Sequence, residues 1–156
     1  MIDSVYGKSS EIQFVAVSTR HPANIADYCA QHGIRMFTSY EQLLADPDID
    51  GVVIATPNSL HESQIIAAAN AGKHVYVEKP FTLTLAAAHN AVTAVQRAGV
   101  TLAVGLNRRF HPNMLELTRR VRAGELGVVS SMIADLTAAT GFHRLASSWR
   151  TQAAEE

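Results

Sequence analysis

The amino-acid sequence predicts an α/β fold, in which a parallel sheet carries helices on both faces. Short apolar runs rich in Val, Ile and Phe recur along the 156 residues, as expected of buried strands. Helical stretches with recognisable ends lie between these runs, and the links that join them are short. From residue 107 onward the pattern changes, which indicates the beginning of a second, α+β domain.

The predicted strands are the apolar runs Ile12 to Val17, Val52 to Ala55, Val75 to Val77 and Val100 to Val104. A helix opening at Pro22 and stopping before Gly33 follows the first run, and a short one after Ser39 ends before Pro47. Ser39 and Ser59 each have Gln or Glu three residues later, the spacing of a capping box. The helix after Ser59 stops at Gly72, and the next runs from its cap Thr84 to Gly99.

The segment 107–156 contains one clear helix, opened by Pro112 and stopped at Gly124. Arg119, Arg120 and Arg122 near its end suit the negative end of the helix dipole. A solvated face is favoured over a nucleic-acid patch for them. The alternation from 128 to 137 predicts a strand that begins a second sheet, and 141–156 is expected to form a loop.

Composition excludes several classes of function. With 13 basic and 14 acidic residues the net charge is -1, so we expect no nucleic-acid partner and no membrane surface. Cys29 is the only cysteine, which excludes an internal disulfide and favours a small core residue. Apolar runs are too short to cross a bilayer and no leader is apparent, so a cytoplasmic protein is expected. The histidines lack metal-ligand spacing, and no metal site is predicted.

Polar residues follow each predicted strand, at the edge where parallel sheets bind ligands. They are Ser18-Thr19-Arg20-His21, Thr56-Pro57-Asn58, Glu78-Lys79-Pro80 and Asn107-Arg108-Arg109. Polar residues on one loop would mean little, since loops are usually solvated. Their recurrence at one edge predicts a binding site, and His61 faces the same edge from the first turn of a helix.

The loop after the first strand bears on cofactor preference. An acidic residue there would accept hydrogen bonds from the adenosine ribose of NAD, whereas hydroxyls with an arginine suit a 2′-phosphate. Ser18, Thr19 and Arg20 therefore favour NADP, with NAD possible. An ordinary solvated turn before Pro22 is the alternative interpretation.

Lys79 is the candidate acid-base residue. Pro80 lacks an N–H and keeps Lys79 out of the helical region, which holds the lysine at the sheet edge. Desolvation beside cations such as Arg108 favours acid-base use of the amine, and Glu78 opposes it. A purely structural pair between Glu78 and Lys79 remains the alternative.

Three longer motifs resemble one known family. They are Asp46-Pro47-Asp48-Ile49-Asp50-Gly51-Val52-Val53-Ile54-Ala55-Thr56-Pro57-Asn58-Ser59-Leu60-His61, Ala71-Gly72-Lys73-His74-Val75-Tyr76-Val77-Glu78-Lys79-Pro80, and Gly105-Leu106-Asn107-Arg108-Arg109-Phe110-His111-Pro112. Their order and spacing resemble the glucose-fructose oxidoreductase, inositol dehydrogenase and rhizopine-catabolism (Gfo/Idh/MocA) family. The resemblance covers most of residues 11–130.

The resemblance implies an amino-terminal Rossmann domain and a carboxy-terminal open antiparallel sheet that closes over the substrate and often mediates oligomerisation. It implies that Thr56, Pro57, Asn58 and His61 line the cofactor and that Glu78 lies near the nicotinamide ribose. Lys79 corresponds to the family's catalytic lysine, and Arg108 to a residue at the nicotinamide end. Trp149 and Arg150 resemble a family pair beside the cofactor.

The sequence also departs from the family pattern. Residues 1–106 are expected to form an incomplete NAD(P)-binding Rossmann fold without the first strand and its glycine-rich loop, and 107–156 the beginning of the substrate domain. The downstream Asp and His of the family's catalytic set are not matched, and His143 lacks their context.

The function implied by the resemblance is hydride transfer between NADP(H) and a sugar, polyol or related hydroxyl compound. We expect this chain to be inactive alone, and a homo-oligomer is possible. The alternatives are a non-catalytic dinucleotide-binding sensor or interaction module, and a fragment without function.

Overall fold

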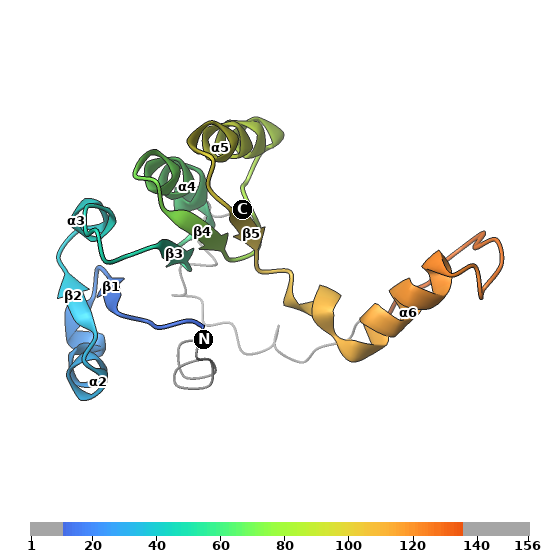
Figure 1. Cartoon of the computed structure of the whole chain (residues 1–156), viewed down its shortest axis with the longest axis horizontal. Coiled ribbons are helices and arrows are strands. Elements are labelled where there is room, and N and C mark those ends of the chain that lie inside the picture. The colour runs from blue at the N-terminus through green and yellow to red at the C-terminus, as the bar shows by residue number, and fades with distance from the viewer. Residues whose placement is uncertain (1–10, 136–156) are drawn as a thin grey trace, which may run out of the picture.

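The computed structural model describes residues 11–135 (Figure 1). Its strands are β1 Ala16–Ser18, β2 Arg35–Phe37, β3 Gly51–Ile54, β4 His74–Val77 and β5 Leu102–Val104. Its α-helices are α2 Ala26–His32, α3 Tyr40–Leu44, α4 His61–Asn70, α5 Leu85–Ala98 and α6 Pro112–Arg122. Short 3₁₀ helices, η1 Pro22–Asn24, η2 Asn58–Leu60 and η3 Asn107–Phe110, come before α2, α4 and α6. The predicted α/β class is confirmed.

The strands form two parallel sheets. One pairs β1 with β2, and the other has the order β3-β4-β5. Strand residues alternate between faces, so Val52, Ile54, Val75 and Val77 point to one side, where they are buried. Helix α4 lies on this side with α5 beside it, as Figure 1 shows. The core of the protein is therefore the layer between β3-β4-β5 and these two helices.

Helices α4 and α5 approach closely because their contact is rich in alanine. Ala68 and Ala69 of α4 and Ala91 of α5 are buried in the same cluster. Glu62 of α4 also accepts a hydrogen bond from the Asn90 side-chain amide of α5, at 2.9 Å. Small side chains bring the backbones together, and this polar contact fixes the two helices relative to each other.

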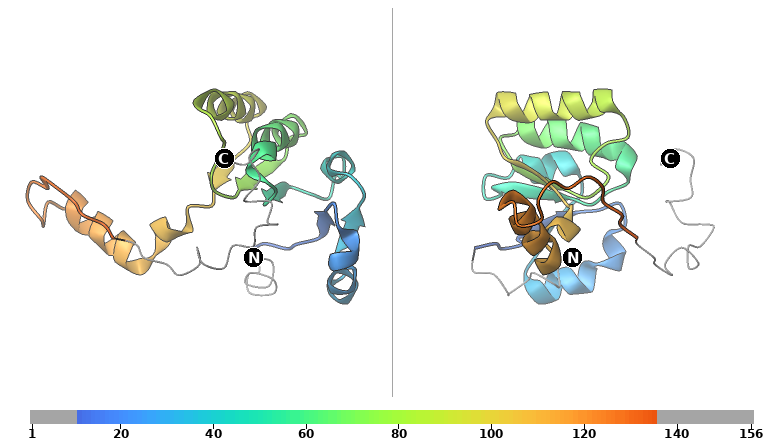
Figure 2. Two further views of the ribbon diagram at one scale, coloured as in Figure 1. Left: turned by 180° about the vertical axis from the view of Figure 1, so that it is seen from behind. Right: turned by 90° about the vertical axis from the view of Figure 1, so that its right-hand side faces the viewer.

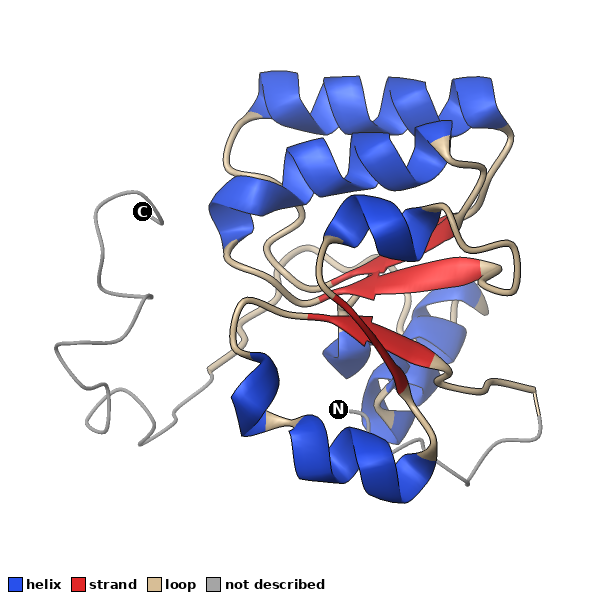
Figure 3. Ribbon diagram, turned by 90° about the vertical axis from the view of Figure 1, so that its left-hand side faces the viewer, coloured by secondary structure: helices blue, strands red, loops and turns tan. Residues whose placement is uncertain are grey.

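The two sheets run in the same direction, which polar contacts at both ends establish. At the carboxyl end, the Tyr40 hydroxyl just after β2 donates to the Gln64 carbonyl oxygen of α4, at 3.1 Å. At the amino end, Arg35 of β2 forms an ion pair with Asp46 (2.6 Å), and the Lys73 ammonium before β4 donates to the Asp46 carbonyl oxygen (2.8 Å). The carboxyl ends of the strands in both sheets therefore lie at one edge, and their amino ends lie at the opposite edge (Figure 3).

Replacement of Tyr40 by phenylalanine is expected to change stability in alkaline solution. Burial, with a smaller contribution from Glu41, raises the pKa of Tyr40 above its ordinary value. The folded state thus keeps a proton that the unfolded state loses above a pH of about 10, so this stabilisation is present below that pH and is lost as pH rises further. We expect the unfolding free energy to fall less steeply above that pH in Tyr40→Phe, as urea titrations across this range would measure. Parallel profiles for the two proteins would contradict this account.

Several helix ends follow their sequence signals. The hydroxyls of Thr84 and Ser39 accept backbone N–H groups of Ala87 and Gln42, which confirms them as N-caps of α5 and α3. Gly33 and Gly99 end α2 and α5 in the left-handed conformation, with φ of 64° and 68°. A residue without Cβ adopts this conformation at little cost, so the predicted stops are confirmed.

Ser59 does not occupy the predicted N-cap position of α4. Ser59 lies inside η2, and α4 begins at His61 with no side-chain cap. The chain already turns at Pro57, whose carbonyl oxygen accepts the Leu60 N–H at 3.0 Å. The first turn of α4 therefore continues from η2, and Glu62 contacts Asn90 of α5.

The predicted strand pattern needs four corrections. β1 begins at Ala16 instead of Ile12, β5 begins at Leu102, and the short strand β2 was not predicted. The expected strand from 128 to 137 is absent over its described residues 128–135, where Val128 and Ile133 are each 96% exposed. A strand needs a hydrogen-bonded neighbour, and the described residues provide none there.

Helix α6 extends away from the sheet and its covering helices (Figure 2). It begins at Pro112 as predicted, with Gly124 in the left-handed conformation just beyond its end. Arg119 and Arg120 form ion pairs with Glu116, and Arg119 also with Glu125, which agrees with a solvated face. No helix among residues 11–135 is both long and apolar enough to cross a membrane.

Candidate functional site

The candidate site is built from loops at the carboxyl ends of the strands. Ser18 is the last residue of β1, and Thr19 and Arg20 follow it. The Thr19 hydroxyl accepts the backbone N–H of His21 at 3.2 Å, which stabilises the turn, while Arg20 is exposed. Within the described residues Arg20 forms no ion pair.

The loop after β3 is held by helix α4. The Thr56 hydroxyl donates to the side-chain oxygen of Gln64 at 2.5 Å, and the same glutamine binds Tyr40 through its backbone. Asn58 opens η2 next to this anchored threonine. Gln64 and Tyr40 were missed by the sequence analysis, because a glutamine in a helix and an aromatic at a helix start carry no sign of a distant partner.

The loop after β4 carries Glu78, Lys79 and Pro80. The Glu78 N–H donates to the Ile54 carbonyl oxygen at 2.9 Å, which extends the sheet by one residue. The Glu78 carboxylate accepts the backbone N–H of Lys79 at 3.3 Å, and the Lys79–Pro80 peptide is cis. Ion pairs among residues 11–135 do not include one between the side chains of Glu78 and Lys79. The Lys79 side chain is exposed at the sheet edge.

Gly105, directly after β5, leaves room for the side chains of Tyr76 in β4 and Glu78 just after β4. A Cβ built on Gly105 would lie 2.9 Å from the Tyr76 hydroxyl and 3.2 Å from Oε2 of Glu78. Its N–H donates to the Val77 carbonyl oxygen at 2.8 Å, so the backbone at this position is fixed by the sheet. The missing side chain of Gly105 thus allows the Glu78 carboxylate to lie over β5.

Gly105→Ala is expected to displace Glu78 while costing little stability. The new methyl group meets the movable ends of two side chains, so we expect a loss of less than about 1.5 kcal/mol. The Lys79 amide, which donates to the Glu78 carboxylate, should shift in the NMR spectrum.

Gly51→Ala is the matched control at the opposite end of the sheet. There the new Cβ would lie 3.0 Å from the carbonyl oxygen of His74, which belongs to the β4 backbone and cannot turn aside. We expect this variant to lose about 1–3 kcal/mol of unfolding free energy and to leave the Lys79 amide unchanged. The reverse order of stability losses would contradict the assignment of Gly105 as a spacer.

His61 lies beneath two of these loops. Its side chain is 0% exposed. Nδ1 is 2.9 Å from the Pro80 carbonyl oxygen, and Nε2 is 3.0 Å from the Thr56 carbonyl oxygen. The resemblance counts His61 among residues lining the cofactor, whereas the structure puts it behind the loops that carry the other candidates.

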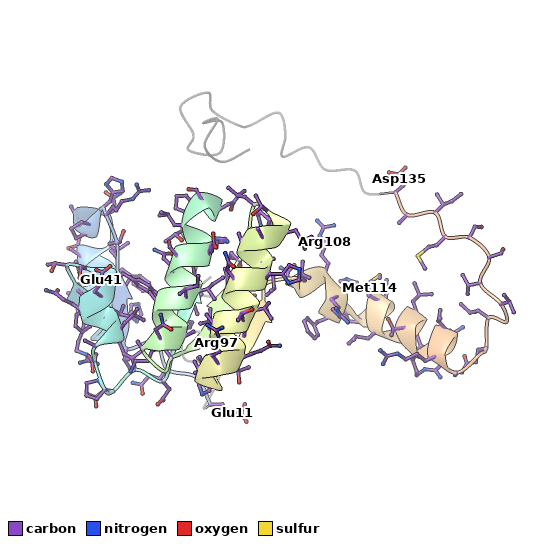
Figure 4. All side chains as sticks on the ribbon, turned by 90° about the horizontal axis from the view of Figure 1, so that it is seen from above. Glu11, Glu41, Arg97, Arg108, Met114 and Asp135 are labelled. Atoms are coloured by element: carbon purple, nitrogen blue, oxygen red, sulfur yellow. The ribbon has the colours of Figure 1, made fainter. Side chains whose placement is uncertain are left out.

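The remaining candidates lie farther along the chain. Arg108 belongs to η3 and is exposed where the chain leaves β5 for α6 (Figure 4). Trp149, Arg150 and His143 lie outside the described residues. Cys29 is 3% exposed on α2, which confirms its assignment to the interior.

Known proteins match this chain over the same region. Residues 2–106 match the family described as an oxidoreductase family with an NAD-binding Rossmann fold. The chain is 46% identical over 86 residues to a scyllo-inositol 2-dehydrogenase (NAD⁺) of Bacillus subtilis, covering 55% of this chain and 25% of the relative. It is 36% identical over 131 residues to a D-xylose 1-dehydrogenase (NADP⁺) of Haloferax volcanii, covering 83% and 40%.

A solved structure gives the same match in three dimensions. The WlbA dehydrogenase from Bordetella pertussis, crystallised in complex with NADH and UDP-GlcNAcA, superposes with a TM-score of 0.68 at 32% identity. The match covers 72% of this chain and 33% of that one. The chain thus spans less than half the length of each of these three proteins. Its sequence motifs, parallel sheet and these matches together show that the chain belongs to the Gfo/Idh/MocA family of oxidoreductases with an NAD-binding Rossmann fold.

Proposed function

We propose that this chain supplies the cofactor-binding side of an oxidoreductase that transfers a hydride between NADP(H) and a sugar, polyol or related hydroxyl compound. The observation that carries the proposal is the exposed Lys79 side chain at the sheet edge, with the turn around it fixed by Glu78. An amine that reaches solvent from a fixed backbone suits proton exchange with a bound substrate.

The described residues fit a dinucleotide. Arg20 is an exposed cation at the end of β1, and the turn beside it presents the hydroxyls of Ser18 and Thr19. A guanidinium forms strong charge-assisted hydrogen bonds with phosphate, which supports NADP over NAD. Toward the other end, the bare α-carbon of Gly105 lets the Glu78 carboxylate lie beside the end of β5, where it can accept hydrogen bonds from a ribose.

Each site residue has a proposed part in the reaction. The nicotinamide, when bound, supplies the hydride acceptor in oxidation and the donor in reduction. The Lys79 amine accepts the proton of the substrate hydroxyl in oxidation and returns it in reduction. Glu78 would accept hydrogen bonds from the nicotinamide ribose, Asn58 and the Thr56-Pro57 backbone would line the cofactor, and Arg108 would lie at its nicotinamide end. Trp149 and Arg150 complete this set in the proposal.

The wider organisation is also proposed. Residues 1–106 would form the dinucleotide-binding unit and 107–156 the beginning of the substrate domain, in a cytoplasmic protein that can form homo-oligomers and binds no nucleic acid. Because the chain spans less than half of its relatives, we propose that turnover requires more than the residues present here. NADPH oxidation by the purified chain would contradict that last point.

Thermal unfolding with and without cofactor tests the binding proposal. A ligand at about a hundred times its dissociation constant adds roughly 2.7 kcal/mol to the unfolding free energy, so both NADPH and NADH should raise the melting temperature, and NADPH more. Lys79→Met should leave this shift unchanged, since Lys79 is assigned to proton transfer. A cooperative transition that neither cofactor moves would overturn the proposal.

A further inference from the structure

The two loops nearest to the proposed chemistry share one buried histidine. His61 is the buried polar residue of the described core, and its ring contacts two main-chain carbonyl oxygens that lie 24 positions apart in sequence, at Thr56 and Pro80. One carbonyl belongs to the loop that carries Asn58, and the other to the loop that carries Lys79. Neither carbonyl can donate, so each contact requires an N–H on the ring.

Each loop has a second attachment close to its contact with His61. On the Lys79 loop, the Glu78 N–H donates to the Ile54 carbonyl oxygen at 2.9 Å, one residue before Lys79. The Pro80 carbonyl oxygen lies one residue after it, 2.9 Å from Nδ1 of His61. Lys79 is therefore held between two fixed points of the backbone.

The Asn58 loop is attached in the same manner. The Thr56 hydroxyl donates to Gln64 at 2.5 Å, and the Thr56 carbonyl oxygen lies 3.0 Å from Nε2 of His61. Gln64 stands one helical turn beyond His61 on α4, and Ile65, four residues after His61, is fully buried in the core. Both loops are thus attached to helix α4, which the core holds rigidly.

We propose that His61 is a positioning residue that sets the two loops relative to each other through separate hydrogen bonds, Nδ1 to the Lys79 loop and Nε2 to the Asn58 loop. A neutral ring has one N–H, so each of its two tautomers donates a hydrogen bond to one of the two loops. A ring with both N–H groups donates to both loops. The inference rests on the proposed function only in treating these loops as the cofactor and proton-transfer site.

Amide side chains can separate the two hydrogen bonds. An asparagine amide reaches about as far as Nδ1 of histidine and a glutamine amide about as far as Nε2, so each can replace one donor. In His61→Asn we expect the Lys79 loop to stay as in the original protein while the Asn58 loop loosens. In His61→Gln we expect the reverse, and in His61→Phe both loops should loosen.

Amide hydrogen exchange measures how firmly each loop is held, and it requires no cofactor. Loss of a hydrogen bond to a buried carbonyl should speed exchange roughly tenfold at the protected amides of the freed loop, which are Glu78 and Lys79 on one side and Leu60 on the other. His74→Phe is the control, because His74 lies at the opposite edge of the same sheet, where its Nδ1 accepts the Thr101 N–H. This variant should change exchange at neither loop.

The outcomes separate this inference from the function that it refines. Selective loosening by the Asn and Gln variants supports the positioning role, even if no cofactor binds. Equal exchange changes at both loops in all three variants, or no change in any, would overturn it, because His61 would then act only by filling space. NADPH titration of the same variants follows as a second measurement, and weaker binding in His61→Phe than in His74→Phe is expected.

Discussion

Ile65→Ala is expected to lower the unfolding free energy by about 2–5 kcal/mol, because it opens a cavity in the middle of the core. Ile65 is 0% exposed on α4, in the same cluster as Ile54 and Val77 of the sheet. Domains of this kind have about 5–15 kcal/mol of stability in total, so this one substitution removes a large part of it. Urea unfolding followed by far-ultraviolet circular dichroism measures the loss.

Ile66→Ala is the matched control for Ile65→Ala. It removes the same atoms from the neighbouring residue of the same helix, where the side chain is only half-buried. We expect a loss of less than half that of Ile65→Ala, with a similar dependence of the free energy on urea. Equal losses would mean that α4 faces the sheet in another orientation.

Ser18→Asp combined with Arg20→Ala is expected to reverse the cofactor preference. Removal of the guanidinium takes away a charge-assisted hydrogen bond to the 2′-phosphate, about 1.5–3 kcal/mol, which weakens NADPH binding roughly 10–100-fold. The new carboxylate at the end of β1 repels that phosphate and accepts hydrogen bonds from the ribose hydroxyls of NADH. Calorimetric titration of both cofactors gives the two dissociation constants.

Arg97→Ala controls for the loss of a positive charge alone. Arg97 lies in the last turn of α5, away from β1 (Figure 4). Its removal should leave the ratio of the two dissociation constants unchanged. The explanation based on Ser18 and Arg20 fails if the double variant keeps the original ratio, or if Arg97→Ala changes it as much.

The parts of the fold that the sequence predicted are those with local causes. Thr84 and Gly99 act on the backbone beside them, so the ends of α5 could be predicted from these two residues. β3 and β4 could be predicted from their short apolar runs, and the alternate valines and isoleucines of these runs pack into the core beneath α4. The polar residues that follow each strand marked the candidate site from local sequence, and the family motifs implied a role for each of them.

The parts that the sequence did not predict depend on distant partners. β2 contains the exposed Arg35 and Met36, so it has no apolar run, and it is a strand because β1 pairs with it. Glu62 has the spacing of a capping residue, and its hydrogen bond with Asn90 of α5 could not be predicted from that spacing. His61 was correctly expected at the carboxyl-end edge of the sheet. Its burial was not predicted, because it depends on the carbonyl groups of Thr56 and Pro80.

Asp46 connects the two sheets at the end opposite to the candidate site. Its carboxylate holds Arg35 and the Asp48 N–H, and its carbonyl oxygen holds the Lys73 ammonium. The contacts of Asp46 and the residues proposed to bind ligand thus occupy separate ends of the same strands. Evolution and protein engineering can therefore adjust heat tolerance through the Asp46 end without altering recognition, and can exchange ligand preferences at the other end without loosening the scaffold.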